Sequence, residues 1–513
     1  MNRDLQKSAK SLKVPQIVSI ATIAPTASLR QVRLPLRSKL LTTPEVYKAA
    51  TAWILSSTVL LTGAIANAVM SQRSAVHEVG FETTPSIYHA QRIRDSVADM
   101  DANIANLLLV PIGQNPDAEK VYQDRKKKLS LLLTRAAENI TIPGEQTLIS
   151  DISLNLNNYI EKVQEAKIFH GQGKNEAALQ AYREAEKIVD GVLMIKADEL
   201  DQINFKALQE SYDSGNRIMV INQLIVFLLG AVVVGSLVGF QILLTKWTNR
   251  RLNVGLLAAT VIATVFILDT LFRLVSSSNL LKVAKVEAFD SLHVLRKARS
   301  TAYSLNADES RYLLDSQFST LHQENFFSKV TELAFIPNGP LPKPQPDRYS
   351  SELRKIVNMP DAPSQSVING AFATQLQNIT FDGERKATQT MINDFLNYFD
   401  IDQKIRATSK REEAIALCTG KSNQAFDVFL ESHQKVMDIN ITAFDTSIYK
   451  ALTYLDVNGV SKSILPVDMV SDTAPNGQNK GLDFFWIKAL LMTGAIAGFT
   501  VYGIRSRIAE YEA

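Results

Sequence analysis

The chain has 513 residues, a hydrophobic share of 46% and a formal net charge of only +3, so as a whole it lacks the charge signature of a nucleic-acid-binding protein. Its single cysteine, Cys418, excludes an internal disulfide framework and any zinc site built from several cysteines. Six histidines without paired spacing argue against a histidine-built metal centre, and we expect no metal and no cofactor.

Residues 1–48 form an arm that is rich in Lys and Arg and contains only Asp4 and Glu45 as acids. Together with the apolar stretch that follows, the arm could be a cleaved secretory signal, or it could be an organellar transit peptide. The arm is longer than a signal peptide's basic region, and the apolar stretch exceeds the roughly 7–15 residues usual there. We therefore interpret residues 1–48 as a basic cytoplasmic arm.

Four stretches of the chain are apolar over roughly 20 residues, which is the length of a helix that crosses about 30 Å of hydrocarbon. Aromatic residues near their ends, such as Trp53, Trp486 and Tyr502, fit the interfacial belts of membrane proteins. The predicted transmembrane helices are residues 49–70, 222–244, 254–275 and 485–504.

The short segments between and after these spans are basic, which predicts their side of the membrane. The turn at 245–253 contains Lys246, Arg250 and Arg251, and the tail at 505–513 contains Arg505 and Arg507. Short cytoplasmic segments are enriched in Lys and Arg. We therefore expect a multi-pass protein of the plasma membrane with both termini in the cytoplasm. The long segments 73–217 and 276–483 would then lie outside.

Two features of the spans are candidate sites. Asp269 and Arg273 are four residues apart in the third span, where an ionisable group is a functional candidate, although a self-compensating pair near the interface is the simpler interpretation. Lys488 is close enough to the end of its span for its amine to reach the interface. Helix packing through small residues is predicted at four glycines: Gly235, Gly239, Gly494 and Gly498.

The segment 73–217 has the apolar periodicity of four helices. The first begins at Thr84 and Pro85, and breaks are expected near Pro111, Pro143 and Gly171. Four helices that leave and re-enter the membrane predict a four-helix bundle. The fold expected is thus an all-α membrane protein with four transmembrane helices and two extracytoplasmic four-helix-bundle-like domains.

The segment 276–483 repeats this plan, and short motifs recur in the same order. The turn sequence of the first domain has a counterpart in the second, and its repeated residues are Asn139, Gly144 and Glu145 with Asn378, Gly383 and Glu384. At other offsets, Gly173 and Lys174 pair with Gly420 and Lys421. Glycine permits the turn between helices, and the glutamate is favoured in the first helical turn. These matches indicate a duplicated span–bundle–span unit.

The two units differ mainly by a proline-rich insertion at residues 336–370. Its prolines remove backbone donors, so we expect no continuous helix there, and we interpret the segment as a linker or a docking loop.

No motif predicts catalysis, and we expect that the protein is not an enzyme. Gly420-Lys421-Ser422 resembles the end of a phosphate-binding loop, but Ile415 stands where that loop needs a glycine. Four acidic residues could be imagined as cation ligands, but they lack the spacing of a calcium loop and are interpreted as solvated helix faces: Asp99, Asp101, Asp308 and Glu309. The histidines are expected at the surface.

The arrangement of spans and helical domains resembles the GlnX family of bacterial membrane proteins. The likeness rests on short motifs: Ile93-Arg94, Asp99-Met-Asp-Ala-Asn103, Asn306-Ala-Asp-Glu-Ser-Arg-Tyr312, Asn378-Ile-Thr-Phe-Asp-Gly-Glu384 and Arg507-Ile-Ala-Glu-Tyr511. The resemblance implies outer domains that receive a glutamine-binding lipoprotein and signal to a cytoplasmic Ser/Thr kinase. The basic arm and the proline-rich insertion depart from the family pattern.

Three functions remain open from the sequence. The first is a sensor or adaptor. Its expected partners are the lipid bilayer and proteins on both sides of the membrane, with no nucleic acid, and a homo-oligomer is possible. The second is a structural or assembly subunit that docks onto a larger membrane complex. The third, a transporter, is weak because four spans with one ion pair offer little for a polar path.

Overall fold

The computed structural model describes residues 42–138, 140, 142–248, 252–361, 363–457, 464–465 and 484–512. Over these ranges the chain is helical, and the β-structure that they contain is one isolated antiparallel bridge between Phe335 and Asn369. The predicted all-α fold is confirmed.

The described helices are divided here into two units, each of which begins and ends with a helix of the stalk. The first unit contains α1 (Thr43–His77), η1 (Glu78–Thr83), α2 (Thr84–Leu108), α3 (Pro116–Glu138), α4 (Glu145–Gly171), α5 (Asn175–Ile188), η2 (Val189–Leu193) and α6 (Met194–Thr248). The second contains α7 (Val254–Lys282), η3 (Val283–Phe289), α8 (Asp290–Leu314), α9 (Ser319–Leu333), α10 (Pro346–Val357), α11 (Ala371–Gln377), α12 (Glu384–Ala407), α13 (Arg411–Ala416), η4 (Leu417–Ser422), α14 (Asn423–Tyr454) and α15 (Phe484–Glu512).

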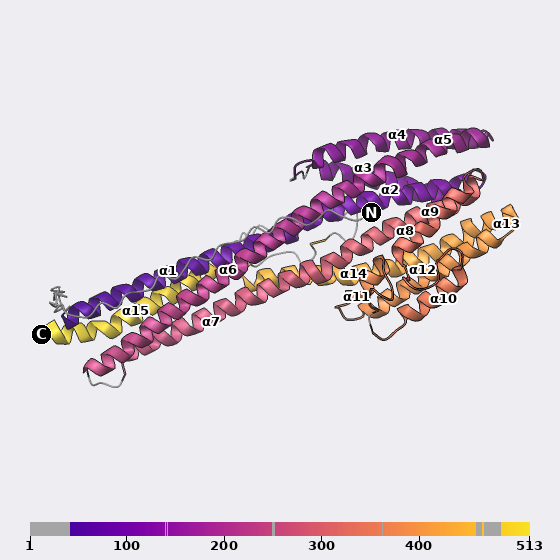
Figure 1. The fold of residues 1–513 in the computed structure, drawn as a ribbon. Coiled ribbons are helices and arrows are strands. Elements are labelled where there is room, and N and C mark those ends of the chain that lie inside the picture. The colour runs from indigo at the N-terminus through magenta and orange to yellow at the C-terminus, as the bar shows by residue number, and fades with distance from the viewer. Residues whose placement is uncertain are drawn as a thin grey trace, which may run out of the picture.

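Within the described ranges, four helices are long and apolar enough to cross a membrane, and they contain the four predicted spans. Three continue without a break into the helical domains: Thr43–Leu108, Asn175–Thr248 and Val254–Leu314, with 66, 74 and 61 residues. At 1.5 Å per residue, the first of these is about 100 Å long. We call residues 43–77, 217–282 and 484–512 the stalk and the remaining helices the head (Figure 1).

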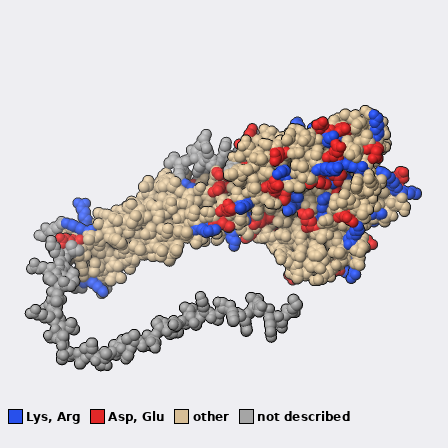
Figure 2. All heavy atoms as spheres, turned by 45° about the horizontal axis from the view of Figure 1, so that its top comes forward, with Lys and Arg blue, Asp and Glu red and all other residues tan. Residues whose placement is uncertain are grey.

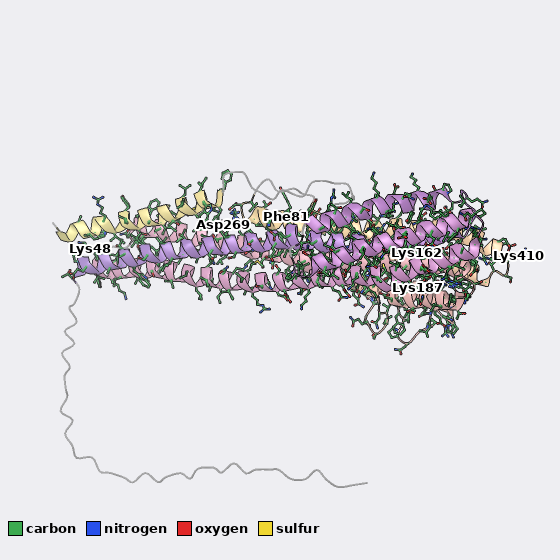
Figure 3. The ribbon with its side chains drawn as sticks, turned by 90° about the horizontal axis from the view of Figure 1, so that it is seen from above. Lys48, Phe81, Lys162, Lys187, Asp269 and Lys410 are labelled. Atoms are coloured by element: carbon green, nitrogen blue, oxygen red, sulfur yellow. The ribbon has the colours of Figure 1, made fainter. Side chains whose placement is uncertain are left out.

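The two parts of the molecule differ in surface chemistry. Figure 2 shows charged side chains gathered on the head, whereas most of the stalk is uncharged apart from Lys and Arg at its free end. Lys48 lies near that end, Asp269 lies farther along the stalk, and Lys410 lies at the opposite tip of the head (Figure 3). An uncharged band between charged ends is the surface that a bilayer requires.

A short π-helix occurs at corresponding places in both units. η1 and η3 lie where the first helix of each unit passes from the stalk into the head, and η2 and η4 lie in the helix that returns. In η1, an added Cβ at Gly80 would lie 2.8 Å from Ile448 Cγ2, so glycine allows η1 to approach α14 closely. Each π-helix therefore changes which face of the long helix packs against the neighbouring helix.

The insertion at 336–370 contains a helix of 12 residues, α10, where its prolines predicted no continuous helix. α10 begins at Pro346, where a proline in the first turn removes no intrahelical hydrogen bond. The helix packs on α12: Tyr349 and Leu353 are fully buried, the Tyr349 hydroxyl donates to Ala334 O at 2.6 Å, and Arg354 pairs with Asp400 at 2.8 Å. The insertion is thus part of the core of the second domain.

Candidate functional site

The two head domains meet along a seam between α2 and α8. Arg296 pairs with Asp95 at 3.2 Å, and farther along Asn106 donates to Asn306 Oδ1 at 3.4 Å and accepts from Ser310 at 3.2 Å. The partners in these contacts are separated by 201, 200 and 204 residues, so the two helices run parallel. Each of these helices follows a stalk helix and a π-helix, and the seam joins the first helix of one head domain to the first helix of the other.

The far end of the seam is held by Arg311, whose side chain is 1% exposed. Its guanidinium contacts Asp101 of α2 at 2.5 Å, Asp308 of its own helix at 3.0 Å and Asp190 of η2 at 3.0 Å. It also donates to the Tyr182 hydroxyl at 3.1 Å. One buried cation thereby joins three helical segments from both domains, and we call these five residues the tip network.

The tip network holds more carboxylates than its arginine can neutralise. Burial raises the pKa of Asp101 to about 6, and burial raises the pKa of the nearby Glu186 to about 7, although Arg311 opposes both shifts. Lys329 pairs with Asp308 and supplies a second positive charge. Asp101 and the adjoining Glu186 therefore hold protons at a higher pH than exposed carboxyl groups do.

A second buried group lies beside the seam in the second domain. Glu309 and Asp402 are both fully buried, and Arg406 pairs with Asp402 at 2.8 Å. Ser422 of η4 donates to Glu309 Oε2 at 3.0 Å. Burial, followed by the charge of Asp402, raises the pKa of Glu309 to about 8, and burial also raises the pKa of Asp402. At neutral pH this pair of carboxyls retains a proton.

The interpretation of the four acidic residues as solvated faces is wrong. Asp99, Asp101, Asp308 and Glu309 have exposed fractions of 4%, 2%, 0% and 0%. The expectation of surface histidines is also wrong, because His322 and His433 are buried and the other four are half-buried. These polar faces meet another helix instead of water, and arginine or backbone groups supply the partners that water would have supplied.

An open cleft of about 420 Å³ lies over the seam between the domains. Its floor contains Asn106, Asn306 and Tyr303, all almost fully buried. Residues of α2 and α3 form one wall, and η4 with α14 forms the other. Because both units contribute to it, a molecule bound there would contact the two domains at once.

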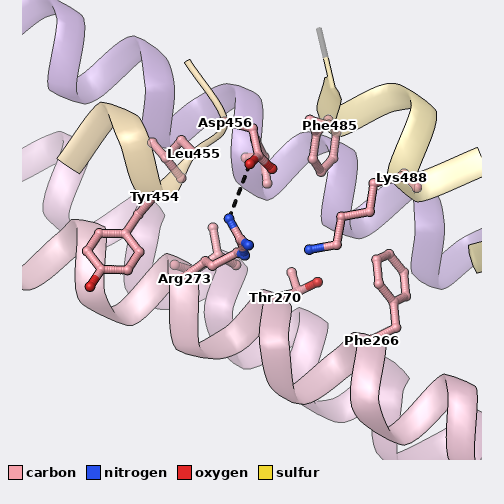
Figure 4. A pocket seen from close by; sticks show the side chains of 11 residues that line it. Phe266, Thr270, Arg273, Tyr454, Leu455, Asp456, Phe485 and Lys488 are labelled. Atoms are coloured by element: carbon pink, nitrogen blue, oxygen red, sulfur yellow. Dashed lines mark hydrogen bonds and ion pairs between the residues drawn. The ribbon is translucent and has the colours of Figure 1, made fainter. Parts of the chain in front are cut away.

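At the stalk, the predicted pair Asp269 and Arg273 is part of a larger group. Arg273 Nε donates to both carboxylate oxygens at 3.1 Å, and Lys488 of α15 also pairs with Asp269. Arg273 Nη1 reaches Asp456, just beyond α14, at 3.2 Å (Figure 4). Arg73 of α1 donates to the Leu455 carbonyl at 2.9 and 2.6 Å.

These contacts form what we call the boundary cluster: Asp269, Arg273, Asp456, Lys488 and Arg73. It connects α1, α7 and α15 of the stalk with the end of α14. Since α14 does not continue into a stalk helix over the described residues, this cluster is its polar attachment to the stalk. An ion group at this depth also satisfies charges that lipid could not.

The predicted packing glycines lie on the outside of the described structure. An added Cβ at Gly235, Gly239, Gly494 or Gly498 would have no atom within 4 Å. The close helix approach occurs instead at Gly255, where a Cβ would lie 2.7 Å from the backbone of Gly503. Asn253 caps α7 and donates to the Gly503 carbonyl at 2.6 Å, which joins α7 to α15.

The repeated turn has the same local geometry in both domains. Gly144 and Gly383 have positive φ angles of 98° and 80°, and each precedes a buried glutamate at the helix start. Glu145 accepts from Ile142 N at 3.0 Å, and Glu384 accepts from Thr380 N at 2.9 Å. Asn378 donates to Ser291 Oγ at 2.6 Å, whereas Asn139 lies outside the described residues.

The proposed match of Gly173 with Gly420 does not hold in the structure. Gly173 lies in the turn between α4 and α5, whereas Gly420 lies inside η4 of an uninterrupted helix.

Sequence reasoning assigned no site role to Arg311, Arg73 or Asp456, and it placed Lys488 at the membrane interface without its partner Asp269. A usable signal was the likeness between Asp99-Met-Asp-Ala-Asn103 and Asn306-Ala-Asp-Glu309, because these segments contain Asp101 and Asp308, and both residues bind Arg311. When similar residues recur in the middle of a helix instead of a turn, they suggest that the same helix face is buried in both units. Among the described residues, no group of three or more His, Cys, Asp and Glu side chains could hold a metal ion.

One comparison with known proteins gave a match. Residues 75–213 are similar to the family described as an actinobacterial sensor domain, and this segment extends from the end of α1 through the first head domain into α6. No curated protein and no solved structure matches the chain. The family match supports a sensor role for a bacterial protein.

Proposed function

We propose that the chain is a non-enzymatic transmembrane sensor and adaptor. In this proposal the head lies outside the cell and receives a solute-binding protein or a small ligand, and the stalk passes the signal to a separate cytoplasmic partner. The match of the first head domain to a sensor family supports the sensing part. The family resemblance makes a Ser/Thr kinase the first cytoplasmic partner to test.

The observation that carries the proposal is the continuity of the long helices. Thr43–Leu108 and Val254–Leu314 each run from the free end of the stalk to the tip of the head, and they contact each other along the buried seam. A helix of this length moves largely as one body, so a shift at the tip changes the position of its other end. The tip network and the boundary cluster are the polar contacts that such a shift would rearrange.

The orientation rests on charge. Figure 2 places Lys and Arg at the free end of the stalk, where short cytoplasmic segments are expected to be basic. Both termini would then be cytoplasmic. The paired π-helices and the shared turn geometry further support duplication of one ancestral unit.

The proposal is tested with the full-length protein in mild detergent. Affinity capture should recover a solute-binding protein or a cytoplasmic kinase, and addition of the outer partner should change the distance between spin labels at Lys48→Cys and Lys246→Cys. These positions lie near the stalk ends of α1 and α6, and the native Cys418 is fully buried. Arg311→Lys, which keeps the charge but loses the planar guanidinium, should retain outer binding and reduce the distance change.

A milder variant controls for misfolding. Asp190→Asn removes one partner of Arg311 whose side chain is 40% exposed, so the fold should tolerate it. Recovery of a large stable complex with no change in label distance would instead favour the structural or assembly role. Label distances that change equally in wild type and both variants would exclude the seam as the transmitting element.

A further inference from the structure

The contacts at the far end of the seam cross between the two domains in both directions. Arg311 of the second domain binds Asp101 of the first at 2.5 Å and Asp190 at 3.0 Å. Arg183 of the first domain binds Asp315 of the second at 2.7 and 2.8 Å. The domains therefore meet here through charged side chains. We call the whole group the tip junction, and it consists of the tip network together with Arg183, Glu186, Asp315, His322 and Lys329.

The tip junction contains more carboxyl groups than basic groups. Its acids are Asp101, Glu186, Asp190, Asp308 and Asp315, and its strong bases are Arg183, Arg311 and Lys329. If every carboxyl group were ionised, the acids would exceed the strong bases by two charges. The side chains of Asp101, Asp308 and Asp315 are at most 4% exposed, so water does not compensate this excess. The junction is therefore most favourable when it holds protons.

Glu186 is the carboxyl group at which a proton is accommodated most easily. Arg311 Nη1 lies 3.4 Å from it, which is farther than the 3.0 Å to Asp190 or to Asp308. His322 faces Glu186 from α9 with a side chain that is 2% exposed, and its Nδ1 atom lies 3.6 Å from Glu186. Neither ring nitrogen of His322 has a hydrogen-bond partner among the described residues. A proton on Glu186 thus reduces the excess charge and breaks no hydrogen bond.

We propose that the tip junction is a pH-sensitive contact: uptake of protons by its carboxyl groups docks α5 and η2 of the first domain onto α8 and α9 of the second, and their release lets these parts separate. Burial raises the pKa of Glu186 to about 7 and that of Asp101 to about 6, so the docked state binds these protons more tightly than a separated, solvated state does. Their contribution to docking is fully present below the usual values of 4.5 and 3.8, and it is lost as the pH rises through 7 and 6. Tyr182 and Tyr159, which also face Asp101, remain neutral because burial raises their pKa values.

Two further groups of the junction have shifted pKa values. Burial lowers the pKa of His322 and the charge of Arg311 lowers it further, so below the usual value of 6.5 His322 opposes docking. Burial acts to raise the pKa of Asp315, but hydrogen bonds from Arg183 lower it below 3.8, so Asp315 stays ionised near neutral pH. The carboxyl groups gain two protons on docking and His322 loses one. Acid should therefore favour the docked state.

This regulation rests on the proposed function in one respect, which is the transmission of a change from the head to the stalk. α8 contains Asp308 and Arg311 and continues through η3 into α7 without a break. Separation at the junction would therefore act on a helix that reaches the free end of the stalk. The pH-sensitive contact itself requires neither a solute-binding protein nor a cytoplasmic partner.

The test measures distances between spin labels in the full-length protein, in an uncharged detergent at constant ionic strength. Labels at Gln180→Cys on α5 and Leu321→Cys on α9 occupy exposed positions in opposite domains, and the native Cys418 is fully buried. From about pH 5 to about pH 7, the ratio of separated to docked molecules should rise about threefold or more per pH unit, because one net proton corresponds to about tenfold. The ratio should level off above about pH 7.

One variant and one matched control assign the response to a residue. Glu186→Gln is neutral at every pH, so it should keep the tip docked in alkaline buffer and remove most of the response, since His322 offsets the uptake left to Asp101. Glu184→Gln makes the same change on the same helix, where the side chain is 44% exposed and pairs with Lys162 of α4. This control should keep the wild-type response. His322→Gln removes the opposing group and should make the response steeper.

A tip distance that does not change with pH, or equal responses in Glu186→Gln and wild type, would overturn the inference. A response in Glu184→Gln as small as that in Glu186→Gln would do the same. A change at the tip without any change between the stalk labels at Lys48→Cys and Lys246→Cys would count against the proposed relay and leave the pH-sensitive contact standing. A relay driven by a partner protein at a tip distance that is independent of pH would reject only the contact.

Discussion

Glu384 shows how strongly a single buried residue can connect a turn to a domain. Its carboxylate is fully buried and accepts hydrogen bonds from Thr380 N, Phe381 N, Gln375 and Asn440. The residue therefore orders the turn before α12 and attaches that turn to α14. Gly383 at the preceding position has a φ of 80°, a conformation that favours glycine. The resulting turn places Glu384 at the start of α12.

Glu384→Ala should destabilise the protein by about 2–4 kcal/mol, because it leaves several buried donors without an acceptor. The measurement is the thermal unfolding midpoint in detergent. Glu384→Gln keeps one acceptor oxygen and should lose less. If the Ala and Gln variants unfold at the wild-type temperature, the turn does not depend on this carboxylate.

The buried pair Glu309 and Asp402 predicts a pH dependence of stability. Glu309 has a pKa of about 8 in the folded protein and near 4.5 in the unfolded chain. Between these values the folded state holds a proton that the unfolded state releases, so the contribution of Glu309 to stability is fully present below about pH 4.5 and is lost as the pH rises through 8. Asp402 acts in the same direction because its pKa is also raised.

The experiment compares unfolding midpoints of wild type and Glu309→Gln from acidic to alkaline pH. Glutamine is neutral throughout, so the variant should gain stability relative to wild type as the pH rises. Contributions from His322 and His433 are present in both proteins and cancel in the difference. Two parallel curves would show that Glu309 does not titrate in this range.

At the scale of the helices, contact depends on which glycines face a neighbour. Gly255→Ala should destabilise the docking of α7 on α15 by about 1–3 kcal/mol, because the new Cβ would lie 2.7 Å from the Gly503 backbone. Gly235→Ala is the matched control: it has open space around it and should be neutral or stabilising. Unfolding midpoints and protease resistance of α15 would report the difference, and equal effects would contradict this assignment.

The same comparison shows what periodicity can predict about elements. Helix starts and stops depend on nearby residues, so the breaks expected near Pro111, Pro143 and Gly171 coincide with the ends of α2, α3 and α4. The π-helices and α10 were not predicted. A π-turn is selected by the packing of neighbours such as Gly80 on Ile448, and no local pattern carries that information.

At the scale of the whole molecule, the head domains are joined by charge as well as by apolar packing. Arg311 connects α8 to α2 and η2, and the boundary cluster connects α14 to three stalk helices. Buried ion pairs such as those of Arg311 contribute little net stability, and we expect them to restrict the helices to a few discrete arrangements. That property suits a protein proposed to change between two arrangements.

The sequence by itself determined the four spans and the all-helical architecture, because hydropathy and helix termination depend on residues that are close together in the chain. It could place Asp269 and Arg273 on one face for the same reason. Only the tertiary structure decided that Lys488 joins them, that Asp101 meets Arg311, and that a polar face is buried instead of solvated. Such contacts depend on two helices that are far apart in the chain. The pattern of residues along one helix does not show which other helix packs against it.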